Sequence, residues 1–290
     1  MSPLHKPTKT DCGAIIPLVT PITGEGKLDE PALRRLIDKV ITGGVQGIFV
    51  LGSTGEGPST PRAMRPRIVQ IAVEQAAGKV RVYAGTSDTV VHDSITAAAE
   101  YLRMGVRAVV VQLPLYYTLT PDEQFNYFST LVRRIPGPVL LYDIPEAVHG
   151  KIEPRVVEHL RAFDSVVGIK DSSGDPEQLK DLLDAYADDP AFSVLTGSVA
   201  LASYGFEYGA DGFVPSTGNL EPELCARLFA AAETGDRALM DELQRDLDAL
   251  TDQFRGPRSL GQGIARLKAI MSKRGLCGPS VFLPLTEASV

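Results

Sequence analysis

The sequence predicts the α/β class, as a (β/α)8 (TIM) barrel followed by a C-terminal all-helical extension. Short apolar runs recur eight times, amphipathic stretches separate them, and the pattern after the eighth run is purely helical. Runs that are apolar throughout are typical of parallel strands covered on both faces. Eight of them alternating with helices favour a closed barrel over an open sheet. The length of 290 residues, 44% of them hydrophobic, suffices for one large core.

The expected strands are five to seven residues long and rich in β-branched side chains. In chain order they are Ala14–Thr20, Gly47–Gly52, Val80–Thr86, Ala108–Leu113, Pro138–Tyr142, Val166–Lys170, Phe192–Thr196 and Gly212–Ser216.

Helical patterns between these runs carry start and stop signals. Clear examples are Glu30–Thr42, Arg62–Ala77, Ser94–Met104 and Glu177–Ala187. Asp29 and Asp175 each come shortly before a proline and a glutamate, a combination that favours a helix start. Glycines at 43–44, 78 and 105 lie where helices should end.

We expect two segments within a single structural unit. Residues 12–220 would form the barrel, and residues 221–290 would pack on it as the extension, helical from Pro222 to about Gly275. Nothing between residues 12 and 285 resembles a flexible linker.

Composition excludes some classes of partner. With 29 basic and 36 acidic residues the net charge is −7, which argues against nucleic acid as the main partner. No apolar run approaches the roughly 18 residues that span a membrane. Met1 to Asp11 lacks the apolar segment of a signal peptide, and the cysteines (Cys12, Cys225 and Cys277) show no metal-ligand spacing. We therefore expect a cytoplasmic protein with reduced thiols.

Lys170 is the strongest candidate for chemistry. It closes the apolar run Val166–Ile169, and residues at the carboxyl ends of barrel strands face the active site. A dry wall disfavours the ammonium form and so makes a neutral, nucleophilic amine accessible. The alternative is a structural lysine paired with Asp171 or another acid inside the barrel.

Other strand ends carry polar groups that suit such a lysine. Tyr142 could donate and accept protons beside it, although a tyrosine that ends a strand is often a packing residue. Ser53 and Thr54 stand in a glycine-flanked turn whose hydroxyl and N–H groups could hold a carboxylate. That composition is also ordinary for a loop.

Taken together, these motifs resemble the dihydrodipicolinate synthase and N-acetylneuraminate lyase family of pyruvate-dependent class I aldolases. The resemblance covers about residues 12 to 285. It rests on Val19-Thr20-Pro21, Gly52-Ser53-Thr54-Gly55-Glu56, Tyr142-Asp143-Ile144-Pro145, Gly168-Ile169-Lys170-Asp171 and Gly209-Ala210-Asp211-Gly212.

The resemblance implies a role for each matching position. Lys170 would form the imine, Tyr142 would shuttle protons and Ser53 would relay them. Tyr116 would enter the neighbouring subunit's site, which implies a homo-oligomer, a dimer or a dimer of dimers (a homotetramer). The pyruvyl carboxylate would bind at Thr54 and Gly55. Gly197 and Val214 would line the pocket. The family's chemistry uses pyruvate and an aldehyde and needs no metal or dissociable cofactor.

The substrate signals point away from both namesakes. Dihydrodipicolinate synthases usually carry an arginine shortly after the Tyr-x-x-Pro segment, whereas this chain has Glu146-Ala147-Val148-His149-Gly150. A guanidinium for a substrate carboxylate is therefore expected to be missing. Sialic acid lyases have acidic residues where this chain has Thr196-Gly197-Ser198-Val199-Ala200. The segments Lys170-Asp171-Ser172-Ser173-Gly174-Asp175 and Gly197-Ser198 look closer to those of aldolases that cleave a 4-hydroxy-2-oxo acid or a 2-keto-3-deoxy sugar acid.

Three alternatives remain open. The first is 4-hydroxy-tetrahydrodipicolinate (dihydrodipicolinate) synthase, and the second is a non-catalytic barrel that binds a 2-oxo acid. The third is a phosphate-binding barrel, but Gly209–Gly212 precedes the eighth expected strand and so lies at its wrong end.

Overall fold

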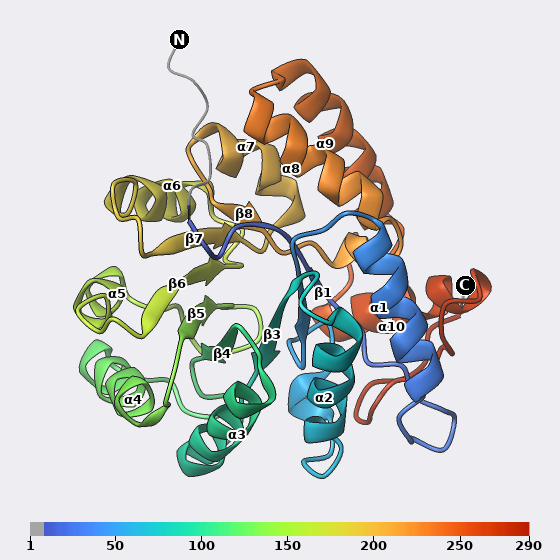
Figure 1. Ribbon diagram of the computed structural model, residues 1–290, viewed down its shortest axis with the longest axis horizontal. Coiled ribbons are helices and arrows are strands. Elements are labelled where there is room, and N and C mark those ends of the chain that lie inside the picture. The colour runs from blue at the N-terminus through green and yellow to red at the C-terminus, as the bar shows by residue number, and fades with distance from the viewer. Residues whose placement is uncertain (1–8, 290) are drawn as a thin grey trace.

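Parallel strands close into a barrel in the computed structural model, which describes residues 9–289 (Figure 1). Each strand pairs with the next along the chain, and the first pairs with the last. The strands are β1 (Gly13–Pro17), β2 (Gly47–Val50), β3 (Arg81–Gly85), β4 (Ala108–Gln112), β5 (Val139–Asp143), β6 (Val166–Asp171), β7 (Ser193–Thr196) and β8 (Gly212–Phe213). All eight expected strands are confirmed.

The largest differences from the expected ends occur at β1 and β8, which each stop three residues early. Beyond Pro17 the amide of the side chain of Asn219 takes the place of a neighbouring strand. Its Oδ1 accepts from Val19 N at 3.0 Å, and its Nδ2 donates to the Pro17 carbonyl at 2.9 Å. A side chain therefore satisfies the backbone where the ladder opens toward the site.

Helices surround the barrel, as the ring of coiled ribbons in Figure 1 shows. They are α1 (Glu30–Thr42), α2 (Arg65–Ala76), α3 (Val91–Met104), α4 (Pro121–Arg134), α5 (Pro154–Leu160), α6 (Pro176–Ala185), α7 (Ala202–Glu207), α8 (Pro222–Thr234), α9 (Arg237–Asp252) and α10 (Leu260–Lys273). The expected caps are confirmed, since Asp29 accepts from Ala32 N and Asp175 accepts from Glu177 N. α2 begins three residues later than expected, at Arg65, because Pro66 fits only in a first turn.

The core has two layers, because successive side chains of a strand point to opposite faces. Ile15, Phe49, Leu140 and Leu195 fill the inside of the barrel. A larger apolar layer lies between the strands and the helices. This alternation decides which strand-end residues face the site and which face the helices.

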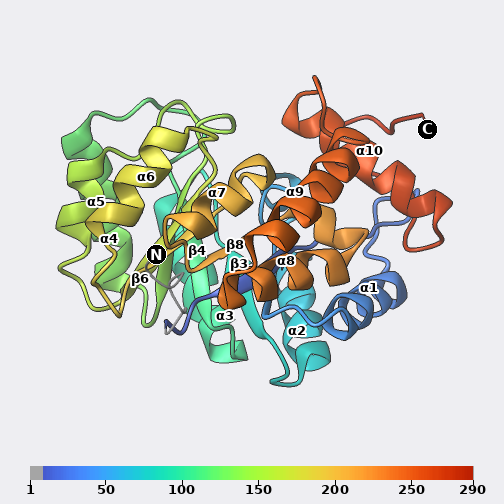
Figure 2. The ribbon, with the colours of Figure 1, turned by 90° about the horizontal axis from the view of Figure 1, so that it is seen from above.

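α8 packs against β1, α1 and α7, so it completes the helical ring of the barrel. We therefore propose that the boundary between barrel and extension lies after Thr234 and not at residue 221. The extension then consists of α9, which packs on α8, and α10. In Figure 2, α10 and the C-terminal segment lie at one end of the molecule with α1, opposite α4 and α5.

The sequence pattern predicts a continuously helical extension, and the structure contradicts this prediction. α9 ends at Asp252 and α10 begins at Leu260. In the connecting loop Gly256 has a φ of +41°, a left-handed conformation that suits glycine, and Pro257 follows it. The break places Phe254 and Arg255 over the barrel mouth.

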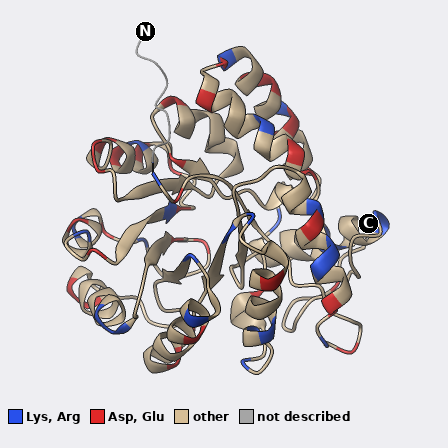
Figure 3. Cartoon of the chain, viewed as in Figure 1, with Lys and Arg blue, Asp and Glu red and all other residues tan. Residues whose placement is uncertain are grey.

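Acidic and basic residues are interspersed along the outer helices in Figure 3. Within residues 9–289, no helix has the length and apolar character needed to cross a bilayer.

Candidate active site

A pocket of about 350 Å³ opens at the carboxyl ends of the strands. Barrel strands, their following loops and the extension all contribute to its walls. It is lined by six of the eight residues expected from the sequence, namely Ser53, Thr54, Tyr142, Lys170, Gly197 and Val214.

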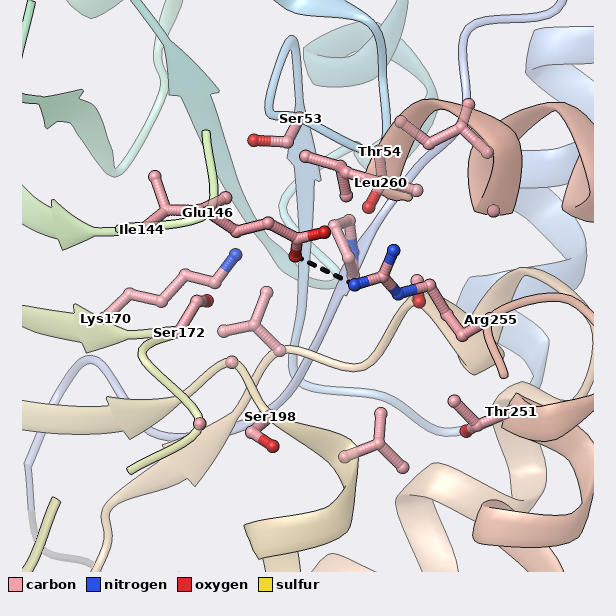
Figure 4. Close-up of a pocket in the computed structure, with 18 of the residues that line it drawn as sticks. Ser53, Thr54, Ile144, Glu146, Lys170, Ser172, Ser198, Thr251, Arg255 and Leu260 are labelled. Carbon is pink, nitrogen blue, oxygen red and sulfur yellow. Dashed lines mark hydrogen bonds and ion pairs between the residues drawn. The ribbon is translucent and has the colours of Figure 1, made fainter. Parts of the chain in front are cut away.

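Lys170 and Tyr142 lie side by side on adjacent strands. They are partners in the parallel register of β5 and β6, so both side chains enter the barrel at the same level. The Lys170 Nζ lies 4.0 Å from the centroid of the Tyr142 ring and 5.4 Å from that of Phe49. Lys170 is only 5% exposed, and Figure 4 shows its ammonium pointing into the pocket. An amine in this position meets any molecule that enters.

The structural alternative, a pair between Lys170 and Asp171, is not what the structure shows. Asp171 lies on the opposite face of β6, where its carboxylate accepts from Ser173 and from the Gln178 amide. In the part of the chain that the structure describes, Lys170 makes no ion pair. The alternation of the strand separates the two charges.

A buried carboxylate anchors the loop that follows β5. Asp143 accepts from Ile152 N at 3.0 Å and from Gln178 Nε2 at 2.8 Å. Burial raises the pKa of Asp143 to about 6, although both hydrogen bonds oppose that change. Because these contacts tie both ends of the loop, Glu146 is held over the pocket.

The turn after β2 brings Ser53 to Tyr142. The Ser53 Oγ and the Tyr142 Oη are 3.4 Å apart, at the long end of the hydrogen-bond range, and either can donate. Leu51 and Glu56 frame the turn, and both have positive φ (58° and 54°). Two non-glycine residues in this conformation show a backbone held by its surroundings.

The same turn presents free backbone donors. Within residues 9–289, the N–H groups of Thr54 and Gly55 donate to no protein acceptor. Gly55 does not line the pocket with a side chain, but a Cβ there would lie 2.8 Å from the Leu18 carbonyl oxygen. Adjacent free N–H groups in a tight turn suit an anion such as a carboxylate.

A model of the dihydrodipicolinate synthetase family matches residues 11–290. The chain belongs to this family. It is 32% identical to a 4-hydroxy-tetrahydrodipicolinate synthase of Hyphomonas neptunium over 274 residues, 94% of this chain and 92% of the relative. The dihydrodipicolinate synthase structure from Bacteroides thetaiotaomicron has a TM-score of 0.89 at 30% identity, covering 96% of this chain and 94% of that one.

A third similarity concerns a member of the dihydrodipicolinic acid synthase family that was solved with pyruvate bound. This is YagE, a prophage protein of Escherichia coli K12, with a TM-score of 0.89 at 26% identity over 97% of this chain and 94% of that one. The resemblance stated from the motifs is thereby confirmed. The protein is an enzyme, a lyase of the class I aldolase type with the fold of the family's pyruvate aldolases.

Gly197 and Val214 follow directly after β7 and β8 and line the pocket. A Cβ at Gly197 would lie 1.9 Å from the Ser172 Oγ and 2.8 Å from the Lys170 Cε. A side chain at position 197 would displace Ser172 or the end of the Lys170 side chain. The glycine therefore allows Lys170 to keep its observed conformation.

Tyr116, like Gly55, is absent from the pocket lining. Its side chain is 75% exposed and packs edge-on against Tyr117, with ring centroids 5.0 Å apart. Two large exposed aromatic rings on one loop are unusual for a surface that faces only water.

The expectation that the pocket lacks a guanidinium was wrong. Arg255 enters from the loop between α9 and α10, and its Nη2 donates to the Glu146 Oε2 at 2.8 Å (Figure 4). The expectation considered only the segment after Tyr142, whereas this arginine lies 109 residues beyond Glu146. In the sequence, only Gly256-Pro257 indicates that a loop interrupts the helical pattern near Arg255.

Proposed function

We propose that Lys170 forms an imine with pyruvate and that the enzyme joins pyruvate to an aldehyde or separates the two. The observation that carries this proposal is the adjacency of Lys170 and Tyr142 in the β5–β6 register, with the lysine buried at the end of a pocket. An amine without an ion-pair partner beside a phenol supplies a nucleophile and a proton donor in one place.

In the proposed reaction the Lys170 amine adds to the carbonyl carbon of pyruvate. Tyr142 gives a proton to the resulting hydroxyl, which leaves as water, and Ser53 relays protons to Tyr142. The cationic imine accepts electrons when C3 gives a proton to the Tyr142 phenolate, and the enamine that forms attacks the aldehyde carbon. The alkoxide oxygen of the former aldehyde then takes that proton from Tyr142. Water then hydrolyses the imine. Cleavage is the same sequence in reverse.

The backbone N–H groups of Thr54 and Gly55 would hold the pyruvyl carboxylate, with Gly197 and Val214 forming the opposite wall. This assignment is supported by the free donors of the turn and by the place of Thr54 in the pocket lining. It places an anion at the inner end of the pocket and leaves the outer end for the aldehyde.

For the second substrate we propose condensation with aspartate semialdehyde, the reaction of a 4-hydroxy-tetrahydrodipicolinate synthase. The names of the Hyphomonas and Bacteroides relatives support it, and Arg255 removes the objection that no guanidinium is present. Cleavage of a 4-hydroxy-2-oxo acid or a 2-keto-3-deoxy sugar acid is the second candidate. It is favoured by the absence of an arginine between Glu146 and Gly150.

We also propose that the active enzyme is a homo-oligomer, a dimer or a dimer of dimers, in which Tyr116 reaches the neighbouring subunit's pocket. The exposed Tyr116–Tyr117 pair supports this assembly. Mixing Lys170→Ala with Tyr116→Phe subunits should then restore activity, because one site in each mixed dimer keeps both groups. We expect the enzyme to act in the cytoplasm, where Cys12, Cys225 and Cys277, free in the structure, stay reduced.

The imine is tested by incubating the protein with pyruvate and cyanoborohydride and mapping the adduct by mass spectrometry. We expect a stable adduct on the peptide that contains Lys170. Lys170→Ala should abolish it, while Lys180→Ala, on the outer face of α6, should not. An adduct on another lysine, or none, would refute the proposal. Comparing kcat/KM for the condensation with that for pyruvate release then separates the two candidate reactions.

A further inference from the structure

The mouth of the pocket carries one cation and one anion from distant parts of the chain. Glu146 follows β5, and Arg255 lies in the loop between α9 and α10. Their side chains point toward each other across the pocket in Figure 4, and their charged atoms are 2.8 Å apart. Arg255 is 30% exposed and Glu146 46%, so water and ligands reach both.

Arg255 retains most of its binding capacity. A guanidinium has five N–H donors. One on Nη2 goes to Glu146 and one on Nη1 goes to the Arg258 carbonyl at 3.3 Å. No other hydrogen bond of the side chain is present within residues 9–289, and Nε is among the free donors. The three remaining donors, one on each nitrogen of the guanidinium, can bind a second carboxylate.

The position of Arg255 is fixed by its surroundings. Its backbone N–H donates to the Thr251 carbonyl at 2.8 Å, which continues the turn at the end of α9. Its side chain passes close to α10, where a Cβ at Gly263 would lie 2.7 Å from the Arg255 Cδ. A donor group held in this way loses little freedom when it binds.

We propose that Arg255 is a specificity-determining residue that binds a carboxylate of the aldehyde substrate, with Glu146 as its partner while the site is empty. The pocket then has anion-binding groups at both ends, the N–H groups of Thr54 and Gly55 inside and Arg255 outside. Such a pocket takes a product with two carboxylates in preference to one with a neutral, hydroxylated end. This inference depends on the proposed function, since it assumes that pyruvate occupies the inner end.

Glu146 sets the strength of this preference. It uses one donor of Arg255 and places a negative charge beside the proposed carboxylate site. An incoming carboxylate therefore competes with Glu146 for the guanidinium. Removing the charge of Glu146 should strengthen the binding of dicarboxylates and leave pyruvate unaffected.

The test uses matched pairs of 2-oxo acids and measures imine formation, so no turnover is needed. The probes are 2-oxo acids of five to seven carbons that carry a terminal carboxylate. Each is compared with the 2-oxo monocarboxylic acid of the same length, whose far end is uncharged and which is called the uncharged probe. The concentration that gives half-maximal trapping by cyanoborohydride is measured for each probe. For the wild type, at least one dicarboxylate should trap at a lower concentration than its uncharged match.

The variants are Arg255→Gln, Arg255→Lys and Glu146→Gln. Arg255→Gln should raise the half-maximal concentration of that dicarboxylate roughly 10- to 100-fold, which is the scale of a lost charge-assisted hydrogen bond. Arg255→Lys keeps the positive charge but lacks the paired N–H donors of a guanidinium. Its half-maximal concentration should lie between those of the wild type and Arg255→Gln. Glu146→Gln should lower the value. Arg274→Gln is the matched control, because Arg274 also pairs with a partly exposed glutamate, Glu221, and neither residue lines the pocket.

Pyruvate and the uncharged probes separate the possible outcomes. If Arg255 only links the extension to the barrel, Arg255→Gln will weaken trapping of charged and uncharged probes alike, and the inference is overturned. It is also overturned if the wild type traps pyruvate but prefers none of the dicarboxylates. A wild type that forms no adduct with pyruvate refutes the proposed function itself.

Discussion

The Lys268 ammonium on α10 lies 2.5 Å from the Glu56 carboxylate in the turn after β2, and neither side chain is exposed to solvent. Lys268 also donates to the Ser280 carbonyl at 2.7 Å, and Glu56 accepts from Phe282 N at 2.6 Å. The turn with Ser53, Thr54 and Gly55 is thus held from outside by the extension. Two segments more than 200 residues apart share one buried charge pair.

Lys268→Met should therefore destabilise the protein and loosen pyruvate binding. Breaking a buried pair leaves an uncompensated charge and costs about 3–5 kcal/mol. Urea unfolding measures the loss of stability, and the KM for pyruvate should rise more than kcat falls. Adding Glu56→Gln should recover much of the stability, because the neutral amide still accepts from Phe282 N. A purely structural pair would leave the KM for pyruvate unchanged in the folded variant.

Gly197→Ala should impair imine formation without unfolding the protein. The new methyl group would contact the Ser172 Oγ and the Lys170 Cε, so the lysine must change its course. We expect the rate of pyruvate trapping to fall by about tenfold or more, the scale of a displaced catalytic group. Gly24→Ala is the control, since a Cβ there meets nothing within 4 Å. Equal trapping rates in both variants would show that Gly197 imposes no constraint on Lys170.

Tyr142→Phe and Ser53→Ala should each lower turnover by roughly 10²-fold, the usual contribution of a group that transfers protons. Both changes are nearly isosteric, so the thermal unfolding temperature should stay close to that of the wild type. Tyr101→Phe, a buried tyrosine outside the pocket, controls for the loss of a hydroxyl. Steady-state kinetics decide the matter, and wild-type turnover in both variants would disprove the relay.

The stability of the protein should depend on the ionisation of Asp143. Burial raises the pKa of this carboxyl to about 6 from an ordinary value near 3.8. The folded state favours the protonated form of Asp143. The resulting contribution to the free energy of unfolding is fully present below about pH 4 and is lost as the pH rises through about 6. This contribution is ~3 kcal/mol, because a difference of one in pKa between the folded and unfolded states corresponds to about 1.36 kcal/mol.

Asp143→Asn removes this dependence. Relative to the wild type, the variant should gain stability as the pH rises from 4 to 6, which urea unfolding at a series of pH values measures. Asp175→Asn, an exposed helix cap, is the control and should show no such gain. A constant difference between Asp143→Asn and the wild type across this range would contradict the raised pKa.

Local sequence patterns were enough to locate the barrel strands and the chemistry at their ends. Apolar runs mark the strands, and alternation along β6 separates Lys170 from Asp171. The motifs around Ser53, Tyr142 and Lys170 identified the family, because each lies within one strand and the turn after it. These features depend on neighbours in the chain, and such neighbours are read directly from the sequence.

The mouth of the pocket depended on contacts between distant segments. The fold alone brings Arg255 to Glu146 and Lys268 to Glu56, and it assigns α8 to the barrel ring. No local pattern in the sequence predicts these pairs. They form because the folded extension packs over loops that follow strands early in the chain. The residues at the inner end of the pocket can thus be predicted from the ends of the strands. The charged pairs at the mouth of the pocket form only when residues far apart in the chain meet in the fold.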